Sequence, residues 1–566
     1  LFVVGAAPPG PPLAETLGHS WPDHALIEGI LRPAALALSA LEGWRVPHRA
    51  IRLNNVFRRA DGRAVLGSFW AAPPASLQPA LFEPPYVAMC PPAGRGEGSI
   101  GDDVYALGVL LLVLALGQAP LAGLDDEAIV RRKLERGCFE ALAGEQRLSS
   151  GIGDLLRGML AEDPEHRPSP AMLCDPAAAR ARRLAARPPR RAQRPLDAGG
   201  SQVSDPRSLA FLLAKDPERH RQLLRSPAIE HWARRSLGDT ALANRIEAAA
   251  RGQADSPGSS RADAFRCLRV IAALDPIAPL CWRGLSFWPD GLGPLLAAED
   301  PGRPDSRLEE VIEGEILASW AEERPERCDR AGLKIDARRY RALLRRPGWS
   351  GGLPRLRYEL NAELACLSPL LADEAVSRAG ELLPALEARA PASPTGQRPV
   401  DREIVAFLAT RADVAFERPP GERGRASEPG AALAPLRMLA QLQQRFHPEQ
   451  SFPRLSAWIG WESEILAGGW HSQARRARIT EALASVIASG KLADMLAILD
   501  NPRDRALDEA EAARARATIA AIDAELTRLH ETAGARAALA GRIGAEVTTA
   551  AGALALAGSV LAMALG

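Results

Sequence analysis

Apolar residues recur at spacings of three and four along most of the chain beyond residue 200. Leu209, Leu212 and Leu213 begin one such stretch, which runs over residues 207–388, and a second stretch covers residues 400–500. These spacings place side chains on one face of an α-helix, whereas a half-buried strand alternates with a period of two. No alternation of useful length follows residue 200. The pattern predicts a mainly α fold with two all-helical modules.

Arginine and proline interrupt the apolar pattern over residues 177–206. No acidic residue separates the arginines of this segment, which are Arg180, Arg182, Arg183, Arg187, Arg190, Arg191 and Arg194. Pro188 and Pro189 stop any helix there, because proline has no backbone N–H and its ring clashes with the preceding turn. Like charges repel one another and favour a solvated linker. The alternative is a contact with anionic lipid or with an acidic partner.

Residues 505–540 have the pattern of one long amphipathic helix. Its apolar positions alternate by three and four, as in a heptad repeat: Ala512, Ala515, Ile519, Ile522, Leu526, Leu529 and Ala533. Such a seam either pairs two chains as a coiled coil or packs on its own domain. The seam at residues 512–533 is therefore a candidate homodimer interface.

Residues 547–566 contain no charged side chain. Leucines alternate with alanine, glycine, threonine and serine, so the insertion energy is small, but the length suits a membrane span. Ala553 and Ala557 have the small-xxx-small spacing that allows close helix pairing. The segment is a candidate transmembrane helix, and the alternative is an alanine-rich packing helix. Arg536 and Arg542 precede it, which favours a cytoplasmic location for the rest of the chain.

Composition narrows the class of protein. A chain of 566 residues is too long for one core, so several domains are expected. The net charge of +1 gives no global field for nucleic acid. The seven cysteines form no CxxC pair, which fits reduced thiols in the cytoplasm, and the histidines show no zinc-binding spacing. Abundant alanine, arginine, proline and glycine are typical of GC-rich bacterial genomes. The chain begins at Leu1 without a signal peptide, so we expect it to start inside a longer protein.

Three motifs stand in order within residues 1–176. They are His48-Arg49-Ala50-Ile51-Arg52-Leu53-Asn54-Asn55, then Asp103-Val104-Tyr105-Ala106-Leu107-Gly108, then Asp163-Pro164-Glu165-His166-Arg167-Pro168. Together they resemble the catalytic loop, the start of the central helix and the late Asp-Pro-x-x-Arg-Pro motif of protein kinases. The resemblance implies the C-terminal lobe of a Ser/Thr-kinase-like fold, with an N-terminal lobe absent or upstream.

Neighbouring segments agree with this resemblance. Phe2-Val3-Val4 is similar to the strand that enters the kinase hinge, and residues 23–41 to the long helix before the catalytic loop. Asp61-Gly62 joins two short apolar runs, which predicts a hairpin. The uncharged run from Val104 to Leu124 is long enough to cross a membrane. Its place in the resemblance makes it a buried core helix of about 14 residues instead, ended by Gln118 and Pro120.

The resemblance also implies that the catalytic site is degenerate. Ala50 stands where the family has the Asp that accepts the substrate proton, and Ser68 stands at the Asp that holds magnesium. Phe69 follows Ser68, and Trp70 replaces the glycine of the family's Asp-Phe-Gly. The remnants of a nucleotide and metal site are His48, Arg49, Arg52, Asn55 and Phe69.

Two further residues are structural anchors by the same resemblance. Asp103 is expected to hold the backbone of the catalytic loop. Arg167 pairs with a Glu in the family, but that Glu is missing after Tyr86, and Glu83 lies nearby at a displaced position. The partner of Arg167 is therefore open.

These features predict a catalytically inactive pseudokinase that acts as a scaffold or regulator through protein partners. The chain is expected to be cytoplasmic and tethered to the inner membrane by residues 547–566, or soluble if that segment packs. The alternative is an active Ser/Thr kinase with rearranged residues, which would use ATP and Mg²⁺. We expect no resident metal, no nucleic-acid partner, and no cofactor unless the kinase site is retained.

Overall fold

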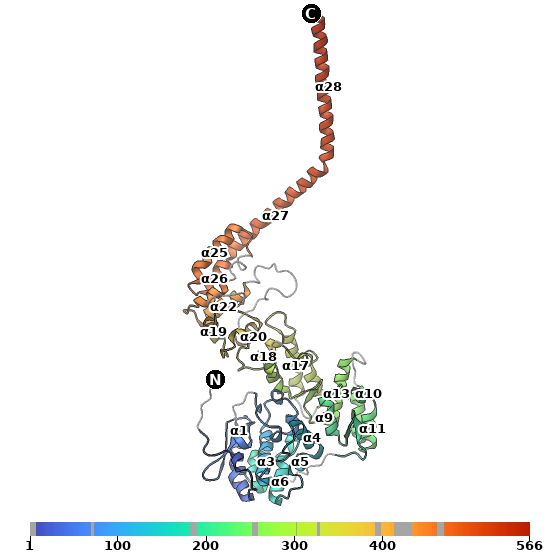
Figure 1. Ribbon diagram of the computed structural model, residues 1–566, viewed down its shortest axis with the longest axis vertical. Coiled ribbons are helices and arrows are strands. Elements are labelled where there is room, and N and C mark those ends of the chain that lie inside the picture. The colour runs from blue at the N-terminus through green and yellow to red at the C-terminus, as the bar shows by residue number, and fades with distance from the viewer. Residues whose placement is uncertain are drawn as a thin grey trace. The chain divides into compact units, whose positions relative to one another are not determined.

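The structure, a computed structural model, describes residues 7–68, 73–181, 190–251, 259–300, 303–324, 329–390, 398–412, 433–460 and 469–566. These residues form mainly α-helices (Figure 1), which confirms the predicted mainly α class. The strands form three small hairpins. Backbone contacts divide the chain into two compact units. The first comprises Leu1–Cys366 and Arg402–Arg411, and the second comprises Leu367–Asp401 and Ala412–Gly566.

The first part of unit 1 is built around a buried helix. Its elements are η2 (Ala25–Leu31), α1 (Arg32–Gly43), β1 (Val56–Arg58), β2 (Ala64–Leu66), α2 (Pro85–Ala88), α3 (Ile100–Leu116), α4 (Asp126–Arg136), α5 (Cys138–Ala143), α6 (Ser150–Met159), α7 (Pro170–Leu173) and α8 (Pro176–Ala181). The helix predicted over residues 23–41 is confirmed as the π-helical η2 running into α1, with Leu26, Ile30 and Ala34 buried.

Helix α3 is the centre of this core. Ser99 caps it in a capping box with Asp102, and every residue from Asp102 to Leu114 is buried. The predicted core helix is thus confirmed, and the membrane span for this run is excluded because its side chains contact protein on all sides. The helix ends earlier than predicted, because Gly117 takes a left-handed conformation with φ of 71°.

The hairpin predicted around Asp61-Gly62 is also confirmed. Strand β1 pairs antiparallel with β2, and Phe57 faces Val65 in the register. Gly62 has φ of 83°, a conformation that a side chain would disfavour. The hairpin places Asn55 and Ser68 at its two open ends, next to the loop that begins at His48.

The second part of unit 1 shares its core with the first. Its helices are α9 (Pro206–Lys215), α10 (Arg221–Arg225), α11 (Ala228–Arg235), α12 (Thr240–Arg251), α13 (Ser260–Leu274), α14 (Leu292–Ala298), α15 (Ser306–Glu313), α16 (Ile316–Glu322), α17 (Arg330–Leu344), α18 (Gly352–Glu359) and α20 (Arg402–Arg411). Tyr86 and Val130 from the first part lie in one apolar cluster with Leu209, Trp232 and Ile271. The two parts of unit 1 are therefore not independent domains.

Two predictions for this region were wrong in detail. The first module, residues 207–388, is not all-helical, because β5 (Leu280–Trp282) pairs with β6 (Leu285–Phe287). In the linker that precedes it, β3 (Leu196–Ala198) pairs with β4 (Ser201–Val203). Each strand has only three residues, too few for a visible alternation.

The predicted linker at residues 177–206 is also structured where it is described. It contains helix α8 at Pro176–Ala181 and the β3–β4 hairpin, in which Ala198 and Val203 are buried. Arg190 pairs with Asp239 at 2.8 Å. Arg182, Arg183 and Arg187 lie outside the described residues.

The boundary near residues 388–400 also differs from the prediction. Helix α20 belongs to unit 1, where Glu403 accepts hydrogen bonds from Arg357 at 3.1 Å and from the Tyr358 hydroxyl at 2.8 Å. The Phe407 ring packs edge-on against the Tyr358 ring. These buried contacts bring α20 to α18, whereas Leu367–Asp401, which lie between the two helices in the sequence, belong to unit 2.

Unit 2 is helical where it is described. It contains α19 (Leu382–Arg389), α22 (Ala434–Phe446), α23 (Pro453–Gly460), α25 (Gln473–Ile487), α26 (Leu492–Leu499), α27 (Pro502–Glu531) and α28 (Ala533–Leu565). The single helix predicted over residues 505–540 is divided at Thr532, and α28 continues through the predicted gap before residue 547. Within the described chain, α28 is the one helix long and apolar enough to cross a membrane, and none of its apolar window is buried.

Candidate functional site

The loop that begins at His48 is held by the N-terminal turn of α3. Asp103 accepts hydrogen bonds from the backbone N–H of His48 and of Arg49, both at 2.7 Å. Burial raises the pKa of Asp103 to about 7, although the Arg49 charge and the two N–H donors oppose this rise. Arg49 has φ of 54°, which is uncommon for a residue with a side chain. The two bonds from Asp103 therefore fix a strained backbone.

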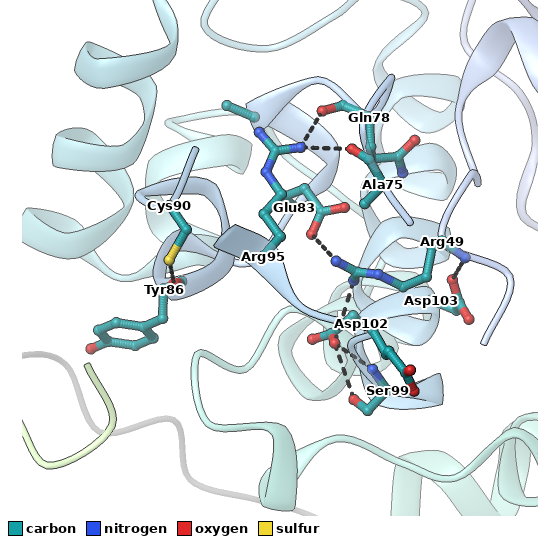
Figure 2. Close-up of polar contacts among 12 residues, drawn as sticks. Arg49, Ala75, Gln78, Glu83, Tyr86, Cys90, Arg95, Ser99, Asp102 and Asp103 are labelled. Atoms are coloured by element: carbon teal, nitrogen blue, oxygen red, sulfur yellow. Dashed lines mark hydrogen bonds and ion pairs between the residues drawn. The ribbon is translucent and has the colours of Figure 1, made fainter. Parts of the chain in front are cut away.

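The Arg49 side chain joins two acids inside the protein (Figure 2). Its Nη2 lies 3.3 Å from Glu83 Oε2, and its Nη1 lies 3.4 Å from Asp102 Oδ2. All three side chains are at least nine-tenths buried. Burial disfavours the charged guanidinium, but the carboxylates of Glu83 and Asp102 outweigh burial and raise the pKa of Arg49. Burial raises the pKa of Glu83, against the opposing charge of Arg49.

Asp102 extends this network to Arg167. The two side chains are 3.0 Å apart, and Arg167 also donates to the backbone carbonyls of Gly101, Ala161 and Glu162. Burial works against ionisation of Asp102, but Arg49 and Arg167 together lower its pKa. The partner of Arg167, which the sequence left open, is thus Asp102, while Glu83 pairs with Arg49. The signal for Asp102 was the Ser99-x-x-Asp102 capping box, which the sequence analysis missed.

Buried donors also fix the segment between β2 and α3. Arg95 donates to the carbonyls of Ala75 and Gln78, each at 2.9 Å, and Gln78 Nε2 donates to the Ile51 carbonyl at 2.7 Å. Lys133 is fully buried and donates to three backbone carbonyls, those of Ala80, Leu81 and Glu83, at 2.8–2.9 Å. Burial lowers the pKa of Lys133 to about 8. None of these anchors was identified from the sequence.

Residues 50 and 68, to which the resemblance to protein kinases gave the lost base and the lost metal ligand, lie together at the end of the hairpin. The Asn55 side-chain amide donates to the Ala50 carbonyl at 2.9 Å and to the Ser68 carbonyl at 2.7 Å. The Asn55 NH₂ group therefore ties the loop to the strand end, and it joins residues 50 and 68 through their backbones. Phe69 and Trp70 lie outside the described residues.

His48 and Arg52 flank this arrangement. The Nε2 atom of His48 lies 3.1 Å from the Gly67 carbonyl, and burial is the main reason that the pKa of His48 is lowered. Arg52 Nη1 lies 3.5 Å from Gln78 Oε1, and partial burial lowers the pKa of Arg52. The structure thus brings together the described site residues from the sequence analysis, with Arg167 connected to them through Asp102.

The acidic side chains of this region already have partners within the protein. Glu83 and Asp102 face arginines, and Asp103 faces backbone amides. Among the described residues, no group of three or more His, Cys, Asp or Glu side chains could hold a metal ion. The arrangement stabilises a loop and offers no ionised acceptor at residues 50, 55 or 68.

A cavity opens beside the buried ion pairs and reaches the second part of unit 1. Its volume is about 280 Å³, and Tyr86, Trp288 and Trp320 contribute aromatic walls. Asp102 and Arg167 form part of its lining. Small-molecule pockets usually measure about 300–1,000 Å³, so this space suits a small ligand or one side chain of a partner.

Comparison with known proteins adds no assignment: no protein-family model and no curated protein sequence matches this chain.

Proposed function

We propose that this chain is a kinase-like protein that transfers no phosphate and works by binding partners at a membrane. The observation that carries the proposal is the chemistry at residues 50 and 68. A methyl group and a neutral hydroxyl stand where phosphoryl transfer needs a carboxylate to accept a proton and a carboxylate to hold magnesium. Loss of a positioned base alone typically slows a reaction by about 10²–10⁴-fold.

The contacts of Asn55 support the proposal. In the kinase family the corresponding side chain binds a metal ion, but here its NH₂ group bonds two backbone carbonyls. A divalent cation prefers several oxygen ligands that include carboxylates. With residues 50 and 68 neutral, the Asn55 oxygen would be left without an anionic neighbour from either position. The residues suit a rigid loop better than a magnesium site.

A role in binding is supported by the rigidity of the same region. Arg49, Glu83, Asp102 and Arg167 form buried ion pairs, and Lys133 anchors the adjoining segment. Such a network holds one surface in one conformation, as a scaffold requires. The aromatic cavity beside it provides a concave feature that a partner could enter.

The membrane part of the proposal rests on helix α28. It has 33 residues, or about 50 Å at 1.5 Å per residue, which exceeds the roughly 30 Å of hydrocarbon in a bilayer. Its last uncharged stretch begins at Val547 and is exposed throughout. Arg536 and Arg542 precede it, which favours the cytoplasm for unit 1.

Thermal unfolding tests the metal half of the proposal. We expect the full chain to unfold at the same temperature with ATP plus magnesium as with ATP plus EDTA, because residues 50 and 68 supply no anionic ligand. A ligand present at 100 times its Kd would instead stabilise the fold by about 2.7 kcal/mol. A magnesium-dependent rise that Asn55→Ala removes would contradict the proposal. The shift is compared within each variant, since Asn55→Ala also loses two hydrogen bonds.

A further inference from the structure

Helix α27 exposes a single apolar stripe. Beyond Asp508, its large apolar side chains are Ile519, Ile522, Leu526 and Leu529, and each is between 36% and 58% exposed. They follow one another at spacings of three, four and three, so they are alternating a and d positions of a heptad. The remaining residues from 509 to 532 are alanine or polar, and no other side chain in the described chain covers the stripe.

The same register continues through the break at Thr532 and along α28. Counting on by sevens from Ile519 and Ile522, the a and d positions are Ala533, Arg536, Ala540, Ile543, Val547, Ala550, Leu554, Ala557, Leu561 and Ala564. Arg536 is the one polar residue among them. The chain bends at this break (Figure 1), but backbone hydrogen bonds of the helical type continue on both sides of it, because Thr532 N donates to the Arg528 carbonyl and the Thr532 carbonyl accepts from Arg536 N. One seam therefore runs from Ala512 to Ala564 (the long seam).

Residues off the long seam change character along its length. Between residues 509 and 532 they include acids, arginines and His530, as expected of a helix surface in water. From Val547 onward they include no charge, and Leu556, Val560 and Met563 are more than three-fifths exposed. A partner helix explains why the apolar seam continues through both the charged region and the uncharged region. Contact with water alone, or with lipid alone, would not require such a seam.

Charges beside the seam favour a parallel pair of identical helices. In that arrangement each g position faces the e position five residues later on the partner. Glu511 then faces Arg516, and Glu525 faces His530, whereas Asp523 faces Thr518. None of these g–e pairs joins like charges, whereas Arg536, at a d position of the seam, would lie beside its own copy. Glu511 also accepts a hydrogen bond from Arg475 of its own chain at 2.8 Å, so its position is already fixed by unit 2.

We propose that two copies of this chain pair in parallel and in register along the long seam, from Ala512 in water to Ala564 in the membrane. In the second half, large a residues alternate with alanine at d, which lets the two backbones approach closely, as membrane helix pairs require. The pairing places two copies of unit 1 on the same side of the bilayer. This inference rests on the membrane anchor of the proposed function, and it does not depend on the absence of phosphate transfer.

Disulfide cross-linking of the full chain in membranes tests the proposal. Ala515→Cys and Ala557→Cys place a thiol at d positions in each half of the long seam. Ala517→Cys and Ala555→Cys are matched controls at positions that face away. With copper phenanthroline as the oxidant, we expect a disulfide-linked dimer for both seam variants and none for either control. The described native cysteines are buried, or partly so for Cys174, and the unsubstituted chain provides the background.

A parallel, in-register pair is required for a residue at either end of the seam to meet its own copy. Cross-linking of Ala515→Cys only with a second variant, Leu529→Cys, would mean an antiparallel pair and would overturn the proposal. Dimers from seam and control positions alike, from neither, or from one half of the seam alone would also overturn it. Membrane association of the uncross-linked chain is scored separately, so a failed pairing leaves the anchor of the proposed function distinguishable.

Discussion

Replacing Arg49 with methionine should lower the free energy of unfolding by about 3–5 kcal/mol at neutral pH, because it leaves Glu83 and Asp102 as buried acids without their shared partner. Equilibrium unfolding of unit 1 in urea measures the change. Arg59→Met is the matched control, since Arg59 is more than half exposed and its pair with Asp61 contributes at most about 1 kcal/mol.

The Arg49→Met variant should also show a stronger pH dependence from Glu83 than the unsubstituted chain. Burial already raises the pKa of Glu83 above its ordinary value of 4.5, and Arg49 opposes that rise. Without Arg49 the pKa of Glu83 rises further, so the folded variant keeps a proton that the unfolded chain releases. The unfolding free energy of the variant should therefore fall as the pH rises above 4.5, and its deficit should be smaller at acid pH. An equal deficit at pH 5 and pH 8 would contradict this role for Arg49.

Ending the chain at Gly541 should move the protein from the membrane fraction to the soluble fraction. The uncharged part of α28 begins at Val547, so the shortened chain has lost the apolar surface that a bilayer would bury. Cell fractionation followed by an alkaline carbonate wash measures the change. Leu556→Arg should weaken membrane retention, because arginine at the centre of a span costs about 2.5–3.5 kcal/mol, while Leu556→Ile serves as its control.

Two outcomes would contradict the anchor. If the full and shortened chains are both soluble, α28 is a packing helix. If both remain in the membrane, the attachment lies elsewhere in the chain.

Local signals in the sequence were sufficient for the elements around the site. The Asp61-Gly62 turn predicted the β1–β2 hairpin, and the apolar spacing over residues 23–41 predicted η2 and α1. Both of these depend on residues within one or two turns of one another, which is the range over which sequence patterns carry information. The buried helix α3 was predicted from the place of its uncharged run in the resemblance to protein kinases, because length alone would also have allowed a membrane span.

The ion pairs of the site could not be predicted from such local patterns. Arg49 meets Glu83 and Asp102 because a proline-rich segment and the start of α3 converge on one loop, and no spacing in the sequence specifies that meeting. Lys133 was missed for the same reason, since its acceptors lie about 50 residues earlier in the chain. A lysine in a charged helix is usually solvated, so its full burial has no local mark.

The β3–β4 and β5–β6 hairpins were missed for a different reason. Gly199-Gly200 and Arg283-Gly284 form turns with positive φ at both positions, and of the two dipeptides only Gly-Gly is a local hairpin signal in the sequence. The strands that they join have three residues each, and a search for longer alternation passed over them. The β3–β4 hairpin therefore lies in residues 177–206, a segment that was predicted to be a linker because of its arginines.

Incorporation of labelled phosphate from ATP, with the purified full chain, magnesium and a generic acceptor protein, tests the central claim most directly. The account predicts no incorporation above that of the Asn55→Ala variant, because Ala50 and Ser68 provide neither base nor metal ligand. ATP-dependent phosphorylation by the full chain that Asn55→Ala abolishes would contradict it, and would identify an active Ser/Thr kinase with rearranged catalytic residues.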